Sequence, residues 1–162
     1  MSPNDLLASG HRMARQLLHR MVDDLTDAEF RHQPVPGANS AAWIVGHLGV
    51  IARRSADRLG ATGLPELTEE FVAQFSATKQ PAGEQLDLGT KAELIALFDL
   101  GVEKLIEAIR ALPVEALTNP PAGARGLATN YGEAVLFGAL HVAMHSGQLS
   151  IIRRSLGKPP VL

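Results

Sequence analysis

Apolar residues recur at three- and four-residue spacing along most of the chain, a pattern typical of amphipathic helices. The first such stretch begins at Ser2, which Pro3 and Asp5 follow in the order that favours a helix start. It ends near Asp23-Asp24, and the pair Thr26 and Glu29 predicts a short extra turn after it. No sustained alternation of β-branched residues competes with this helical pattern.

Three further long helices are predicted by caps and stop signals. Asn39 or Ser40 caps the second helix, which runs to about Leu59 and stops before Gly60. Thr90 and Glu93 cap the third helix, over about 91–112, which stops before Pro113. Thr129 caps the fourth helix, which ends at Leu156 before Gly157. A connection over about 60–89 contains one short predicted helix near 65–75, and a loop rich in Pro, Gly and Asn over about 113–128 precedes the last helix.

The fold class that follows is all-α, with a single domain over residues 1–162. Helices of roughly 20 residues are about 30 Å long, and a connection of roughly 30 residues can span that distance. The second and third helices can therefore run parallel. The chain predicts a four-helix bundle with a long crossover between its second and third helices.

Two stretches lack Asp, Glu, Lys and Arg entirely, one between Arg31 and Arg53 and one between Glu133 and Arg153. A membrane-spanning interpretation fails on content, because prolines interrupt the first stretch and histidines the second. Apolar helices in a chain of ordinary composition are typically central. We therefore expect the second and fourth helices to be the buried inner walls of the bundle, with Arg153 at a solvated helix end.

His141 and His145 are four residues apart on the fourth helix. Their side chains are separated by about 6 Å along the axis and face the same side, as in helical His-x-x-x-His metal sites. The alternative is a pair of core histidines bonded to the backbone or to each other. The other uncharged stretch carries His47, so His47, His141 and His145 form a candidate three-ligand site. Gly138 leaves room beside the expected ion.

The other candidates are weaker. Gln148 continues the same stripe as His141 and His145 and can bond a substrate or a metal-bound water. His11, His19 and His32 lie among Arg, Gln and Asp, which favours polar faces or turns without a functional role.

Composition narrows the function classes. The net charge is −2 and the basic residues are scattered, so no nucleic-acid partner is expected. The chain has no cysteine, which excludes disulfides and thiolate metal sites and leaves histidine and carboxylate as ligands. The first residues lack a signal-peptide pattern, so we expect a cytoplasmic protein without a membrane partner.

The segment from Ser40 through Trp43 to His47-Leu48, and His141-Val-Ala-Met-His145-Ser-Gly-Gln148-Leu149 far downstream, together resemble the DinB-like (YfiT-like) superfamily. The resemblance covers nearly the whole chain. It implies a four-helix bundle, often dimeric, that holds one divalent ion, zinc or nickel foremost, through His47, His141 and His145. It also implies a reaction that uses a low-molecular-weight thiol such as mycothiol or bacillithiol.

Three protein ligands leave a coordination position open, as in catalytic sites. That position can accept water, giving a hydrolase, or an exogenous thiol, giving an S-transferase that acts on a small-molecule substrate. The resemblance favours the thiol, with Gln148 as the catalytic residue that orients it or its target. A non-catalytic metal-binding stress-response bundle stays the third alternative. Apolar helices with only 4% aromatic residues, and the resemblance, predict a homodimer.

Overall fold

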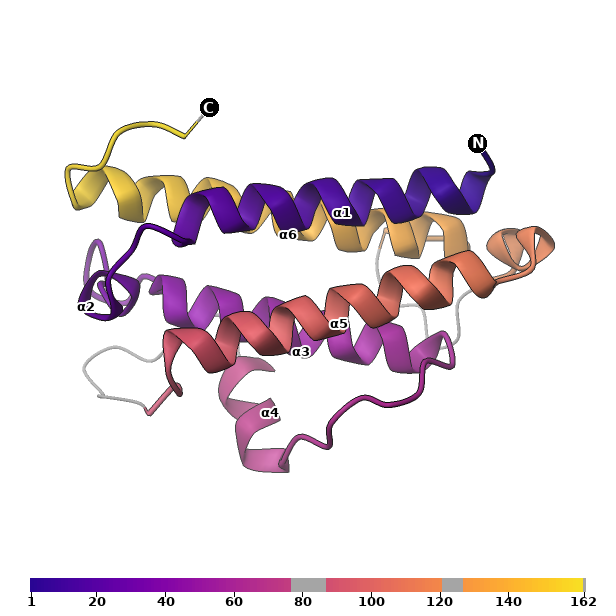
Figure 1. Ribbon diagram of the computed structural model, residues 1–162, viewed down its shortest axis with the longest axis horizontal. Helices are drawn as coiled ribbons and strands as arrows, with labels where there is room; N and C mark the ends of the chain where they lie inside the picture. The colour runs from indigo at the N-terminus through magenta and orange to yellow at the C-terminus, as the bar shows by residue number, and fades with distance from the viewer. Residues whose placement is uncertain (77–86, 121–126, 162) are drawn as a thin grey trace.

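The structure is a computed structural model that describes residues 1–76, 87–120 and 127–161, and the regular elements in these ranges are all helical (Figure 1). They are α1 (Pro3–Val22), α2 (Asp27–Phe30), α3 (Ala41–Arg58), α4 (Glu69–Ser76), α5 (Lys91–Ala111), the 3-10 helix η1 (Val114–Thr118) and α6 (Tyr131–Ser155). The all-α class and the four long helices of the sequence prediction are confirmed. The predicted connection at 77–86 and the predicted loop at 121–126 lie outside the described residues.

The helix starts follow local hydrogen bonding. Ser2 and Asp5 form the predicted capping box of α1, and Thr90 and Glu93 form that of α5. The side chain of Ser40 caps α3 by accepting from the amide of Trp43. Each of these caps satisfies an amide that has no partner within its own helix.

Three local predictions were wrong. Asn130, not Thr129, caps α6; Thr129 instead donates from its amide and hydroxyl to the carboxylate of Glu133. The short helix in the long connection spans Glu69–Ser76, so it begins four residues later than predicted and ends one residue later. Residues Val114–Thr118 form a 3-10 helix where a loop was expected, since Pro113 ends α5 but leaves a following turn free to form.

Contacts along the helices give their directions. The side chain of Asn4, at the start of α1, donates to the carbonyls of Ile109 and Leu112 at the end of α5, so these helices are antiparallel. Gly49 of α3 lies beside Phe98 of α5, and Gly101 of α5 lies beside Arg53 of α3. The residue numbers rise together along the two helices, so this pair is parallel. The predicted crossover between the second and third long helices is confirmed, and α1 with α6 forms the other parallel pair (Figure 1).

Helix α3 is the centre of the core, as predicted. Trp43, Ile44, Val45 and Leu48 are each at most 2% exposed. The glycines of the α3–α5 contact allow the two backbones to approach closely. A Cβ atom on Gly101 would lie 2.9 Å from the backbone nitrogen of Arg53, closer than atoms pack.

Helix α6 is not the buried inner wall that the sequence predicted. Only 28% of its most apolar 18-residue window is buried, although by length and composition it is apolar enough to cross a membrane. One side packs on α1 and faces α3. The other side presents a stripe of exposed apolar side chains, which we name the α6 stripe: Leu136, Phe137, Leu140, Met144 and Ile151. The lack of charged residues identifies an apolar helix, but it does not show whether other parts of the same chain bury that helix.

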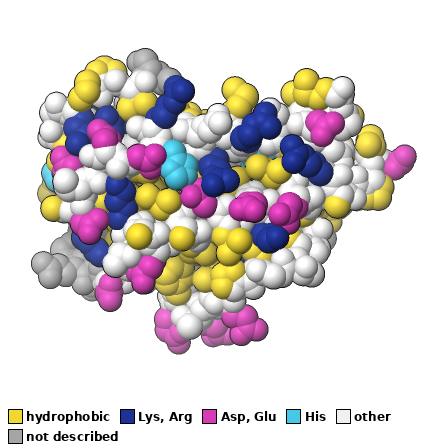
Figure 2. Space-filling view, in the orientation of Figure 1, with side chains coloured by type: hydrophobic (Ala, Val, Ile, Leu, Met, Phe, Trp, Pro, Cys, Tyr) yellow, Lys and Arg dark blue, Asp and Glu magenta, His cyan; other side chains and the backbone are white. Residues whose placement is uncertain are grey.

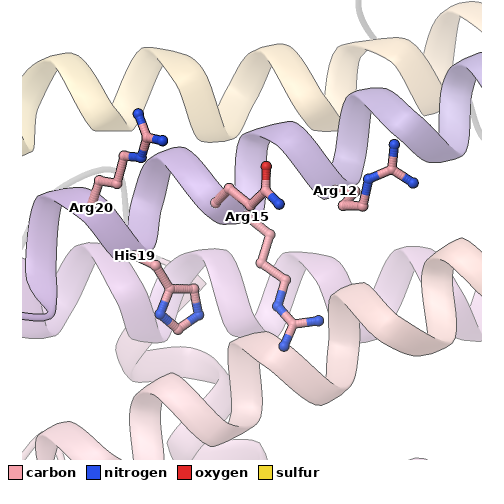
Figure 3. Close-up of a pocket in the computed structure, with 5 residues that line it drawn as sticks. Arg12, Arg15, His19 and Arg20 are labelled. Carbon is pink, nitrogen blue, oxygen red and sulfur yellow. The ribbon is translucent and has the colours of Figure 1, made fainter. Parts of the chain in front are cut away.

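The outer face of α1 is tied to α5 by an ion network. Asp99 accepts from Arg15 Nε at 2.7 Å and from His19 Nε2 at 2.8 Å, and Asp23 accepts from His19 Nδ1 at 2.9 Å. Burial alone would lower the pKa of His19, but the bonds to the two carboxylates outweigh it and raise that pKa. Arg15 and His19 extend toward α5, whereas Arg12 and Arg20 extend away (Figure 3). Basic and acidic side chains are interspersed over this face (Figure 2).

Arg153 is not at a solvated helix end. It is 5% exposed and donates to the carbonyl of Met21 and to the carboxylate of Asp24, which lowers the pKa of Asp24. This pair joins the ends of α6 and α1. The sequence could not show it, because the partner lies more than a hundred residues away.

Replacement of two helix glycines by alanine should have opposite effects on stability, because only Gly101 lies at the close α3–α5 contact. Gly101→Ala forces the α3 backbone away and should destabilise the protein by about 1–3 kcal/mol. At Gly10 the added Cβ would lie 3.8 Å from the Cβ of Ala139, an ordinary contact, so Gly10→Ala should stabilise by about 0.5–1 kcal/mol. Urea unfolding of the two variants measures both changes in the free energy of unfolding. Equal effects of the two substitutions would contradict the close approach of α3 and α5.

Candidate metal centre

The three histidines predicted as ligands lie together. Antiparallel packing of α3 against α6 places His47 opposite His141 and His145, and the potential ligand atoms of the three side chains are all within 4.8 Å of one another. The ring centroids are 5.2 Å apart for His47 and His141, 5.1 Å for His47 and His145, and 4.7 Å for His141 and His145. In the described part of the chain, this cluster contains no carboxylate.

One pair of nitrogens lies near the spacing that a small divalent ion needs. The Nε2 atoms of His141 and His145 are 3.1 Å apart. Two nitrogens bound tetrahedrally at 2.0–2.1 Å would be roughly 3.3–3.4 Å apart, so a small shift accommodates zinc. The same contact also suits a hydrogen bond between the two rings, which the alternative of paired core histidines predicted. A pair of bonded histidines does not need a third ring, whereas a ligand atom of His47 also lies within 4.8 Å of those of His141 and His145.

Hydrogen bonds fix two of the rings from behind. His47 Nδ1 donates to the carbonyl of Phe75 at 2.7 Å, and His145 Nδ1 donates to Oε1 of Gln148 at 2.9 Å. With hydrogen on each Nδ1, the Nε2 lone pairs of both rings face the cluster. Protein metal sites use such bonds to set the tautomer and orientation of their histidines.

The short helix α4 serves the site through its last turn. The carbonyls of Gln74 and Phe75, which lack partners within α4, accept from Trp43 Nε1 at 3.1 Å and from His47. Gly46 makes this possible, because a Cβ there would lie 2.2 Å from the ring of Phe75. The ring of Trp43 stacks on His47 with centroids 5.0 Å apart, and Phe137 stacks on His141.

Burial disfavours the charged form of two of the three rings. Burial, together with the neighbouring His145 and His47, lowers the pKa of His141 to about 4. Burial also lowers the pKa of His145, although its bond to Gln148 opposes this. Neutral imidazoles have the free lone pair that a metal needs. All three side chains are only partly buried, so the cluster is open to solvent.

Gln148 lies where the sequence stripe placed it, but its oxygen bonds to His145. This contact makes it a residue that positions a candidate ligand. Its predicted role in orienting a thiol or its target stays a prediction, as does the role of the three histidines as ligands.

Two expectations near the site were wrong. Gly138 does not leave room beside an ion, because a Cβ there would lie 3.0 Å from Cε1 of His11. His11 is not on a polar face: it is 3% exposed, and its Nε2 contacts the carbonyl of Val135 at 2.9 Å. The spacing of Ala8, His11, Ala14 and Leu18, all buried, is the signal that would have identified it. His32 lies near the surface, 3.0 Å from the hydroxyl of Ser155.

Comparison with protein families matches residues 11–149 to the model of the DinB superfamily. The chain belongs to the DinB superfamily. The matched range includes all three histidines and Gln148. None of the curated proteins is similar enough in sequence to match this DinB chain.

A solved structure shares the DinB fold of this chain. The crystal structure of a conserved protein from Enterococcus faecalis superposes with a TM-score of 0.69 at 16% sequence identity. The match covers 98% of this chain and 99% of that one. At this identity the likeness concerns the fold alone.

The lowered pKa of His141 predicts a pH effect on the metal-free protein. The unfolded chain binds a proton near pH 6.5, but the folded chain does so only near pH 4 at this residue. Between these values the unfolded state holds more protons, so the free energy of unfolding should fall as the pH is lowered through this window. Urea unfolding in chelator should show a smaller fall for His141→Gln than for the unchanged protein. If the free energy of unfolding fell equally with pH in the two proteins, the lowered pKa of His141 would be contradicted.

Proposed function

We propose that this DinB protein binds one divalent metal ion through His47, His141 and His145 and catalyses transfer of an exogenous low-molecular-weight thiol to a small electrophile. The observation that carries the proposal is the cluster itself. Three histidines, two of them with a lowered pKa, place potential ligand atoms within 4.8 Å of one another, and all three side chains are partly exposed. Three protein ligands without a fourth in the described residues are typical of catalytic sites.

The donor set fits borderline metals. Imidazole nitrogen suits zinc and nickel, whereas calcium and magnesium prefer oxygen ligands. Zinc or nickel is therefore the ion that we propose for this centre.

The side chains around the cluster prepare it for chemistry. The carbonyl of Phe75 and the amide of Gln148 hold two rings in place, and the rings of Trp43 and Phe137 exclude water from the sides that they cover. A divalent ion, when bound, supplies a Lewis acid that lowers the pKa of a thiol or a water molecule.

Two observations support a thiol over water as the nucleophile. A thiol with a pKa near 8.5 loses its proton far more readily than water, and the cluster in the described residues offers no carboxylate to act as a base. The chain has no cysteine, so the thiol comes from outside. Membership of the DinB superfamily agrees with this proposal, and a cytoplasmic location would supply the thiol.

Metal content is the first test. The purified protein should contain about one divalent ion per chain, and His141→Ala or His145→Ala should remove most of it, because two nitrogens bind far more weakly than three. His32→Ala, which removes a histidine outside the cluster, is the matched control and should retain the ion. Elemental analysis with circular dichroism of each variant makes the measurement. Full stoichiometry in both cluster variants would refute the centre.

The reaction is the second test. Metal-loaded protein should accelerate the displacement of chloride from 1-chloro-2,4-dinitrobenzene by thiols such as mycothiol or bacillithiol, and chelation should abolish the acceleration. With metal in excess, Gln148→Ala should lower the rate by about 10–100-fold, as loss of a residue that orients a ligand does. If no thiol reacts faster with loaded than with chelated protein, a hydrolase or a non-catalytic metal-binding bundle becomes the better account.

We also propose that the protein is a homodimer through the α6 stripe. Its five side chains are each at least 39% exposed and no charged residue interrupts α6 between Glu133 and Arg153. Apolar surfaces of this kind are usually covered by a partner. A second copy offers the same face, which a two-fold axis can pair with itself.

The homodimer predicts the effect of a charge at the centre of the stripe. Light scattering at micromolar concentration should give the mass of two chains. Leu140→Glu should give the mass of one, because a carboxylate would be buried without a partner. Met13→Glu, which places the same charge at an exposed apolar position of α1, should stay dimeric. A monomeric unchanged protein would refute the dimer.

A further inference from the structure

A pocket of about 400 Å³ lies next to the candidate metal centre. The segment between α2 and α3 forms one wall with Pro34, Val35 and Ala38, and α6 forms the other with Gln148, Ile151 and Ile152. The pocket is shaped by a tight turn, in which the amide of Ala38 donates to the carbonyl of Val35 at 3.0 Å. Gly37 in that turn has a φ of 79°, a conformation that glycine adopts without strain.

Gln148 connects the pocket to the histidines. Its Oε1 accepts from His145 Nδ1 at 2.9 Å, while the same side chain lines the pocket. A molecule in the pocket is therefore separated from a candidate ligand by a single side-chain amide. The amide nitrogen of Gln148 remains as a donor for that molecule.

The lining has the chemistry of a site for an uncharged molecule. None of the described residues that line it carries a charge. Val35, which lies outside the α6 stripe, is 61% exposed, so this wall of the pocket presents apolar surface to solvent. A volume of this size lies within the range of small-molecule pockets, which is roughly 300–1,000 Å³. An anion or cation would lose hydration here without gaining an opposite charge.

We infer that this pocket binds an uncharged, largely apolar small molecule whose hydrogen-bond acceptor meets the amide of Gln148. The pocket meets His145 from the Nδ1 side, behind the ring, so this ligand is separate from anything held at the Nε2 atoms of the histidine cluster.

Two related fluorophores test the charge preference. N-phenyl-1-naphthylamine is uncharged, and 8-anilinonaphthalene-1-sulfonate carries a sulfonate on the same ring system. Titration of the full chain should give saturable binding of about one uncharged probe per chain, with the sulfonate at least about tenfold weaker, since its charge finds no partner. Equal affinity for the two probes, or no saturable binding, would overturn the inference.

Substitutions locate the bound probe. Val35→Asp and Ile151→Asp should each weaken binding of N-phenyl-1-naphthylamine by at least about tenfold, because a carboxylate then lines the apolar wall. Met13→Asp, at a 65% exposed position of α1, should leave the affinity unchanged. Val35 lies outside the α6 stripe, so its variant separates the pocket from the proposed dimer contact. Unchanged affinity in both pocket variants would place the probe elsewhere and overturn the inference.

The titrations are made on metal-loaded and on chelated protein, with metal content measured separately. Probe binding that follows the pattern above in protein unable to retain metal supports the pocket while the proposed function fails. Full metal content together with absent probe binding overturns the pocket while the metal centre stands.

Discussion

The six imidazole nitrogens of the cluster lie in uncharged stretches of α3 and α6, where each nitrogen that is removed from water needs a partner. Desolvated nitrogens without partners cost roughly 1–3 kcal/mol apiece. The carbonyl of Phe75 serves His47, the amide of Gln148 serves His145, and the two Nε2 atoms of His141 and His145 face each other. The bonds of Trp43 and His47 to the carbonyls of Gln74 and Phe75 hold α4 against α3.

The rest of the bundle supports this arrangement by holding α3 still. Gly49 and Gly101 bring α5 against one side of α3, and the buried side chains around Trp43 and Ile44 fill the space between. On the opposite side, the bond of Arg153 to Asp24 ties the end of α6 to the end of α1. This bond fixes that end of α6 against α1, and His141 and His145 lie opposite His47.

Local signals in the sequence were sufficient for the helices and for the grouping of the histidines. Capping pairs such as Thr90 with Glu93 act within a few residues, and the lack of charge around His47 and around His141 marks the two helices that carry the histidines. Properties that depend on distant partners could not be predicted. The pairing of Arg153 with Asp24, the ring of His11 against Gly138 and the open side of α6 all depend on which helices become neighbours.

The anchoring of α4 has a consequence for how the site can be tuned. Because Trp43 and His47 bond to the last-turn carbonyls of this eight-residue helix, its local unfolding would release Nδ1 of His47. Ligand affinity at His47 and the order of α4 are therefore thermodynamically linked, and the linkage acts in both directions. Substitutions in a segment that contributes no candidate ligand can strengthen or weaken the centre without altering any histidine.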